Sequence, residues 1–113
     1  MTINLHNTNK AITSFGNRLR LRRKLLNLSQ EAVGVSIGLD ESCSRVRISR
    51  YETGVHEPNL TTMKKLAVTL KAPPEYFYCE RNSIAELLLV AHNFSDEQIE
   101  ILTKKFFSYT NRV

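Results

Sequence analysis

The sequence predicts an all-α protein, and three observations support this fold class. Apolar residues recur at the spacing of three and four residues that amphipathic helices show. The most regular example comprises Leu60, Met63, Leu66, Ala67 and Leu70. Residues that cap helices, such as Ser29, Asn59 and Ser95, stand directly before stretches of this kind. The alternation of polar and apolar residues that marks a strand is absent, and so is any internal repeat.

The composition indicates one small folded domain. The chain has 113 residues, of which 42% are hydrophobic and 24% charged. Its longest apolar run, from Leu87 to Ala91, is far shorter than the ~18 residues of a membrane-spanning helix. The first residues lack the basic and then apolar order of a signal peptide. We therefore expect a soluble, cytoplasmic protein that binds no membrane.

The net charge of +5 is unevenly distributed along the chain. Residues 1–75 hold 12 Lys and Arg against 6 Asp and Glu, a net +6, whereas residues 76–113 hold 4 against 5, a net −1. A basic first part suits a protein that binds a polyanion, although solvated surface charge would give the same composition. The placement of the basic residues must distinguish these alternatives.

The pattern divides the chain into three parts. Residues 1–14 are rich in Asn and Thr without a sustained period, which predicts an N-terminal arm. Residues 15–80 predict a helical domain, and residues 81–113 predict a helical tail.

Residues 15–80 predict five helical elements. Their expected ranges are Phe15–Leu26, Gln30–Ile37, Glu41–Glu52, Leu60–Lys71 and 75–78. Gly38 and Gly54 can adopt the left-handed conformation that ends a helix, and Asp40 or Ser42 can cap the third helix.

The tail predicts two further helices and a surface that needs a partner. The first covers Ser83–Ala91, and the second follows the capping-box sequence Ser95-Asp-Glu-Gln. The second helix carries one continuous apolar stripe, which consists of Ile99, Leu102, Phe106 and Tyr109. Little of the domain is left to cover this stripe, so we expect it to mediate dimerisation, most simply as a homodimer.

The second and third predicted helices fit the helix-turn-helix plan of DNA binding, because a glycine turn joins them and the third carries several arginines. Three motifs then resemble the phage-repressor (Cro-like, XRE) family of transcription regulators over about residues 15–80. The motifs are Leu28-Ser-Gln-Glu, Ile48-Ser-Arg-Tyr-Glu-Thr-Gly and Glu57-Pro-Asn-Leu. The resemblance implies a five-helix, lambda-repressor-like DNA-binding domain with a C-terminal helical extension. It also implies a repressor that binds a palindromic operator in double-stranded DNA as a dimer.

The chain departs from the family in one place. Gln30 and Ile48 are 18 residues apart, four more than in the family, and the added residues fall within Gly38–Arg47. The insertion either lengthens the turn or adds a helical turn to the start of the third helix.

The resemblance assigns roles to particular residues. The base-reading positions fall on Ser44, Arg45, Val46, Arg47 and Arg50. Arginine can pair with O6 and N7 of guanine, although a contact with phosphate or solvent is the alternative for each arginine. Gln30 is expected at a phosphate or an outer base, and Arg23 and Glu52 correspond to a structural ion pair. Further candidates for DNA phosphate contacts, by position and charge, are Arg18, Arg20, Asn59, Thr61 and Lys64.

Enzymatic and metal-binding functions find no support in the sequence. Cys43 and Cys79 are 36 residues apart without a Cys-x-x-Cys pair, and the three histidines are scattered. Phosphate-binding glycine loops and nucleophile motifs are absent. We therefore expect no enzyme, no metal and no cofactor. Cys43 is either a redox-sensing thiol or, as we favour, a small residue that faces a helix.

The sequence also fits a second interpretation. The chain could be an antitoxin-like protein-binding module whose tail covers another protein and whose DNA binding serves autoregulation. The apolar stripe of the last helix fits either interpretation, whereas the arginines of the third helix favour DNA.

Overall fold

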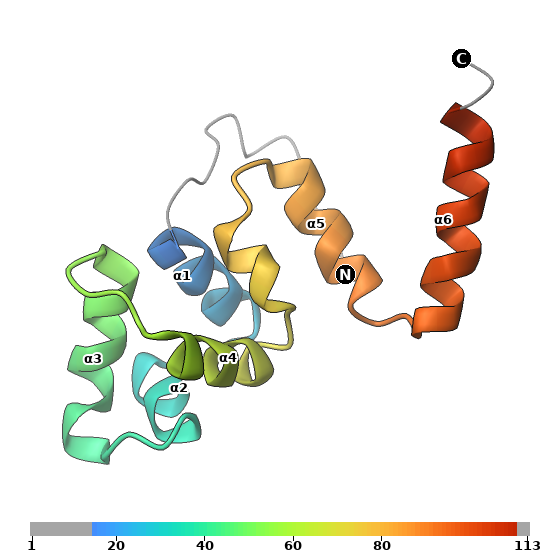
Figure 1. Ribbon diagram of the computed structural model, residues 1–113. Helices are drawn as coiled ribbons and strands as arrows, with labels where there is room; N and C mark the ends of the chain where they lie inside the picture. Colours follow the sequence, from blue (N-terminus) through green and yellow to red (C-terminus); the bar gives the residue numbers. More distant parts are fainter. Residues whose placement is uncertain (1–14, 111–113) are drawn as a thin grey trace.

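The computed structural model describes residues 15–110, and every regular element in this range is helical (Figure 1). The elements are α1 (Phe15–Leu25), α2 (Gln30–Ser36), α3 (Glu41–Thr53), α4 (Leu60–Thr69), the 3-10 helix η2 (Pro74–Tyr78), α5 (Asn82–Ala91) and α6 (Asp96–Thr110). The predicted all-α class is confirmed, with four α-helices and one 3-10 helix between residues 15 and 80. The predicted arm at 1–14 lies outside the described residues.

Helix boundaries follow the local capping chemistry. The hydroxyl of Ser29 accepts a hydrogen bond of 2.9 Å from the backbone N–H of Ala32. The side chain of Asn59 accepts one of the same length from the backbone N–H of Thr62. Ser95 and Gln98 form the predicted reciprocal capping box, with bonds of 2.9 and 3.2 Å. Asp40 precedes α3 without a side-chain cap bond.

Helix α4 ends two residues earlier than the sequence predicts. Its last helical residue is Thr69, and Lys71 adopts a left-handed conformation with φ of 53°. Lys71 thus ends the helix in the role that glycine usually fills, and only Ala72 separates it from the proline pair.

A single apolar core lies between α1, α2, α3, α4, η2 and one side of α5. Its fully buried members include Leu19, Val33, Ile48, Leu66, Leu70, Tyr76 and Phe77. The Phe15 and Phe77 ring centroids lie 5.6 Å apart, so that η2 lays its aromatic residues against α1. Ala85 and Leu89 extend the core to α5.

Two buried arginines of α1 attach the later helices to the core. Arg22 Nε donates to Leu70 O at 2.8 Å, and its Nη2 donates to Lys71 O at 3.1 Å, which satisfies carbonyls at the end of α4. Arg18 donates to Cys79 O, to Glu80 O at 3.3 Å and to Asn82 Oδ1 at 3.2 Å, immediately before and at the start of α5.

The Arg18 guanidinium also lies 5.3 Å from the centroid of the Tyr76 ring. Burial raises the pKa of the Tyr76 phenol above its ordinary value of 10.0, so the ring stays neutral beside the cation at physiological pH. One side chain thus joins α1, η2 and α5.

Helix α6 stands apart from this core. None of its residues is buried, and Figure 1 shows it at the opposite end of the molecule from α3. In the described part of the chain, no helix is long and apolar enough to cross a membrane.

The Arg18 contacts generate a prediction about stability. We expect Arg18→Met to lower the free energy of unfolding by about 3 kcal/mol, because it leaves buried carbonyl groups without donors. Arg20→Met on the exposed side of the same helix is the matched control and should change this energy by less than ~0.5 kcal/mol. Urea unfolding followed by circular dichroism, at equal protein concentration, measures both. Equal stability of the two variants would contradict the role given to Arg18.

Candidate nucleic-acid interface

Helices α2 and α3 pack at unusually close range. A four-residue turn, Ile37 to Asp40, connects them, and Gly38 takes the left-handed conformation with φ of 94°. A Cβ atom on Gly34 of α2 would lie 2.4 Å from Cβ of Ser44, so only glycine permits this approach. The close contact between Gly34 and Ser44 therefore fixes the orientation of α3 against α2.

The packing divides α3 into a buried side and an exposed side. Ser44, Ile48, Tyr51 and Glu52 are buried. Four residues that the sequence assigned to base reading are exposed, namely Arg45, Val46, Arg47 and Arg50. In the described part of the chain, the one ion pair is that of Arg23 with Glu52, so the three arginines on α3 have no intramolecular carboxylate partner.

The assignment of Ser44 to base reading is wrong. Its exposed fraction is 0%, and its hydroxyl donates to Asp40 O at 2.8 Å. The cause is the contact with Gly34, which the sequence motif does not reveal because the two residues lie on different helices.

The ion pair that the resemblance implied is present in the structure. Arg23 Nε lies 2.6 Å from Glu52 Oε2, Arg23 Nη2 lies 3.1 Å from Oε1, and the two side chains are 11% and 3% exposed. Arg23 Nη1 also donates to Leu28 O at 3.0 Å. This bidentate geometry ties the end of α3 to α1 and to the loop before α2.

Gln30 belongs to the same network, which the sequence did not predict. Its Nε2 donates to Glu52 Oε1 at 3.1 Å, so the carboxylate accepts from both α1 and α2. The side chain that was expected at a DNA phosphate or outer base is thereby oriented by Glu52, and its role toward DNA stays a prediction.

The remaining phosphate candidates separate into two groups. Arg18 is not available for a phosphate, because it is 3% exposed and fully engaged with the start of α5. Arg20, Asn59, Thr61 and Lys64 are exposed. Asn59 also caps α4. Lys64 lines a surface hollow together with Lys71, Pro74 and His92, toward the end of α5.

The four inserted residues lengthen α3 rather than the turn. The turn of four residues has the ordinary length for a helix-turn-helix unit, whereas α3 has 13 residues. The first turn of α3 carries the exposed residues Glu41 and Ser42. Ser42 was not among the predicted site residues.

Neither cysteine takes part in a larger site. Cys43 and Cys79 are free thiols of intermediate exposure. In the described residues, no group of three or more His, Cys, Asp or Glu could hold a metal ion.

Comparison with known proteins shows clear relatives for this arrangement. Residues 19–77 match the helix-turn-helix family. An uncharacterized HTH-type transcriptional regulator of Sinorhizobium medicae is 32% identical over 63 residues, which are 56% of this chain and 42% of that protein. Repressor protein C2 of Salmonella phage P22 is 38% identical over 61 residues, which are 54% of this chain and 26% of the repressor. The chain thus spans less than half the length of these curated relatives.

Solved structures extend the similarity into the tail. The transcriptional regulator BswR is 33% identical and superposes with a TM-score of 0.75 over 82% of this chain and 92% of its own. The P22 c2 repressor in complex with a synthetic operator is 33% identical, with a TM-score of 0.55 over 61% of this chain and 98% of its own. Because residues 1–80 together make up a smaller share of the chain than 82%, the match to BswR includes tail residues.

The Arg23–Glu52 network generates a second prediction about stability. We expect Glu52→Gln to lower the free energy of unfolding by about 3 kcal/mol, because it leaves the Arg23 cation buried without its counter-charge. Glu31→Gln on the exposed surface of α2 is the matched control. Its free energy of unfolding should lie within ~0.5 kcal/mol of that of the wild type. Thermal and urea unfolding of the full chain measure the difference. A cost for Glu52→Gln as small as that of the control would show that solvent screens the pair.

Proposed function

Since the chain belongs to the helix-turn-helix family of the phage-repressor (XRE) type, we propose that it regulates transcription as a repressor that binds a specific sequence in duplex DNA. One observation carries this proposal. The arginines of α3 are exposed, have no carboxylate partner among residues 15–110, and project from a helix that is held by the α2 contact and the Glu52 network.

The chemistry of the exposed side of α3 suits base edges in the major groove. The guanidinium groups of Arg45, Arg47 and Arg50 can pair with O6 and N7 of guanine. Val46 is 45% exposed, and an apolar side chain at this place can contact the methyl group of thymine. The net +6 of residues 1–75 favours the phosphate backbone, which supplies most of the affinity without sequence preference.

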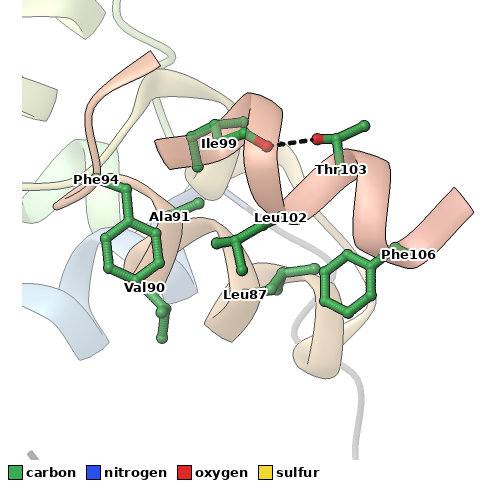
Figure 2. A pocket seen from close by; sticks show the side chains of 8 residues that line it. All are labelled: Leu87, Val90, Ala91, Phe94, Ile99, Leu102, Thr103 and Phe106. Atoms are coloured by element: carbon green, nitrogen blue, oxygen red, sulfur yellow. Dashed lines mark hydrogen bonds between the residues drawn. The ribbon is translucent and has the colours of Figure 1, made fainter. Parts of the chain in front are cut away.

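We also propose that the tail makes the protein a homodimer. An apolar hollow of about 190 Å³, called the tail groove here, lies between α5 and α6 (Figure 2). Its lining consists of Leu87, Val90, Ala91, Phe94, Ile99, Leu102, Thr103 and Phe106. Three of the four residues of the predicted stripe line it, whereas Tyr109 lies further along α6 and is 70% exposed.

The tail groove supports self-association for an energetic reason. A helix of 15 residues without a buried side chain receives little tertiary stabilisation, and short helices are marginal in water without it. Phe106 is 60% exposed, and a second tail laid on the groove would remove it from water. A twofold dimer would place two copies of α3 in successive major grooves, ~34–36 Å apart, on a palindromic operator.

The first test of the proposal is charge reversal on α3. We expect the double variant Arg45→Glu with Arg47→Glu to lose binding to a selected duplex by at least about 100-fold, because each arginine contributes ~1–3 kcal/mol and the new charges repel phosphate. The double variant Lys104→Glu with Lys105→Glu on α6 makes the same change of charge and should bind within a few-fold of the wild type. Fluorescence anisotropy at several salt concentrations measures both.

Two outcomes of this test would change the conclusion. Unchanged DNA binding by the α3 variant would place the duplex elsewhere on the molecule. Wild-type protein without duplex binding, but with a stable complex with another protein through the tail, would favour the antitoxin-like alternative.

The second test is the oligomeric state in solution. We expect the wild type to sediment as a dimer at micromolar concentration, and Phe106→Asp to sediment as a monomer because a charge in the tail groove opposes burial. Val68→Asp is the control, because Val68 is 80% exposed on α4, outside the tail groove, and its variant should remain dimeric. A wild-type monomer both with and without DNA would end the dimer proposal.

A further inference from the structure

A hollow of about 590 Å³ lies between the C-terminal part of α4 and the C-terminal end of α5. Its volume is in the range of sites that bind small molecules, ~300–1,000 Å³. Ala67, Ala72 and Pro74 form an apolar part of its wall. It shares no lining residue with the tail groove, so it is a separate feature of the surface, and we call it the basic hollow.

The basic hollow concentrates positive charge. Lys64 and Lys71 line it from α4 and the end of that helix, and His92 lines it from the end of α5. Among the described residues that line it, none is acidic, and neither lysine has a carboxylate partner within residues 15–110. The adjoining hollow along α4 shares Lys64 and adds Lys65, again with no acidic residue in the described part of its lining. Like charges that lie close together repel one another, so this surface favours an anion.

Lys71 occupies a backbone position that favours glycine. Its φ of 53° lies in the left-handed region, where the Cβ atom of an L-residue is crowded. The carbonyl of Lys71 accepts from Arg22 Nη2 at 3.1 Å, a bond that glycine would make equally well. The exposed lysine side chain is thus carried at a conformational cost that the Arg22 contact does not require. Residues held in such conformations cluster at binding sites.

The donors of the basic hollow suit a phosphate dianion better than a carboxylate. A lysine ammonium binds phosphate as a point charge, whereas a carboxylate is matched best by the planar fork of arginine. No arginine of residues 15–110 lines the hollow. A phosphate monoester carries a charge of ~−1.5 to −2 near pH 7 and presents three acceptor oxygens. Lys64, Lys71 and His92 supply three separate donors for them.

From these observations we propose that the basic hollow is a binding site for a small phosphate monoester. The phosphate group lies at Lys64, Lys71 and His92, and the organic body packs on the apolar wall and on Val68, which is 80% exposed. Such a ligand contacts the DNA-binding domain through α4 and the tail through the end of α5. Its binding does not require α3 to contact DNA, so this site goes beyond the proposed function and is independent of it.

The experiment is a titration of the isotope-labelled full chain with phenyl phosphate, a phosphate monoester with an aromatic body, followed by the backbone amide resonances in NMR spectra. We expect saturable shifts centred on Lys71, Ala72 and Asn93, with a Kd of about 1 mM. Inorganic phosphate should bind about three- to tenfold more weakly, because it leaves the apolar wall exposed to water. Benzyl alcohol, which has the ring without the charge, should cause no saturable shift at these residues.

Three variants locate the site. Lys64→Gln and Lys71→Gly each remove one charge from the basic hollow, and Lys24→Gln removes the same charge from the exposed surface of α1, outside the hollow. We expect each hollow variant to bind phenyl phosphate about tenfold more weakly, because a charge-assisted contact is lost. The control should bind within about twofold of the wild type.

The stability of Lys71→Gly separates a role in binding from a structural role. We expect its urea midpoint to be at least as high as that of the wild type, because glycine accepts the left-handed conformation and keeps the carbonyl that Arg22 uses. Weaker binding together with undiminished stability then identifies the lysine side chain as part of the site.

Two results would overturn the proposal. One is the absence of saturable shifts with about 10 mM phenyl phosphate, and the other is equal affinity of both hollow variants and the control. If the ester does not bind while Lys64→Gln and Lys71→Gly weaken duplex binding at every sequence, the hollow is a contact for DNA phosphates instead. The charge-reversal variants of α3 test the proposed function separately, so the two failures are distinguishable.

Discussion

The exposed side of α3 depends on one buried carboxylate. Glu52, near the end of α3, accepts hydrogen bonds from Arg23 of α1 and from Gln30 of α2. Nearer the start of α3, the close contact between Gly34 and Ser44 holds the helix against α2. Two fixed points determine both the direction of a helix and its rotation about its axis. The same carboxylate that stabilises the fold therefore determines which side chains of α3 face solvent, and hence which can meet a base.

Helix α1 connects the interface to the tail because its arginines have different environments. Arg23 faces α3, Arg22 satisfies the end of α4, and Arg18 holds the segment that leads into α5. Arg20 alone of these four is exposed. The basic character of this helix, which in the sequence suggests a DNA-facing surface, is thus largely structural. The charges that remain available to a polyanion lie mainly on α3 and α4.

The sequence predicts the fold better than it predicts the interface, and the reason is physical. Helices, caps and the core stripe of α4 follow from contacts within a few residues, so Ser29, Asn59 and Ser95 mark their boundaries correctly. The burial of Arg18 depends on partners more than 60 residues away, and the burial of Ser44 depends on a glycine of another helix. Neither contact leaves a local pattern. The Arg23–Glu52 pair was accessible only through the resemblance to a known family.

Helices α3 and α6 lie at opposite ends of the molecule (Figure 1), and the proposed function gives each end its own task. A helix without buried residues contributes little to the stability of its own chain, so its apolar surface is retained at a cost in solubility unless a second surface covers it. The short recognition surface of α3 offers only a few base contacts, and a single copy would discriminate poorly among many sites. In the proposed homodimer, coupling two copies through the tail would multiply the discrimination of each half-site, provided that the link between head and tail is rigid. The contacts of Arg18 with Cys79, Glu80 and Asn82 hold the start of α5 against α1, so in such a dimer the geometry of two bound half-sites would depend on a buried side chain of α1.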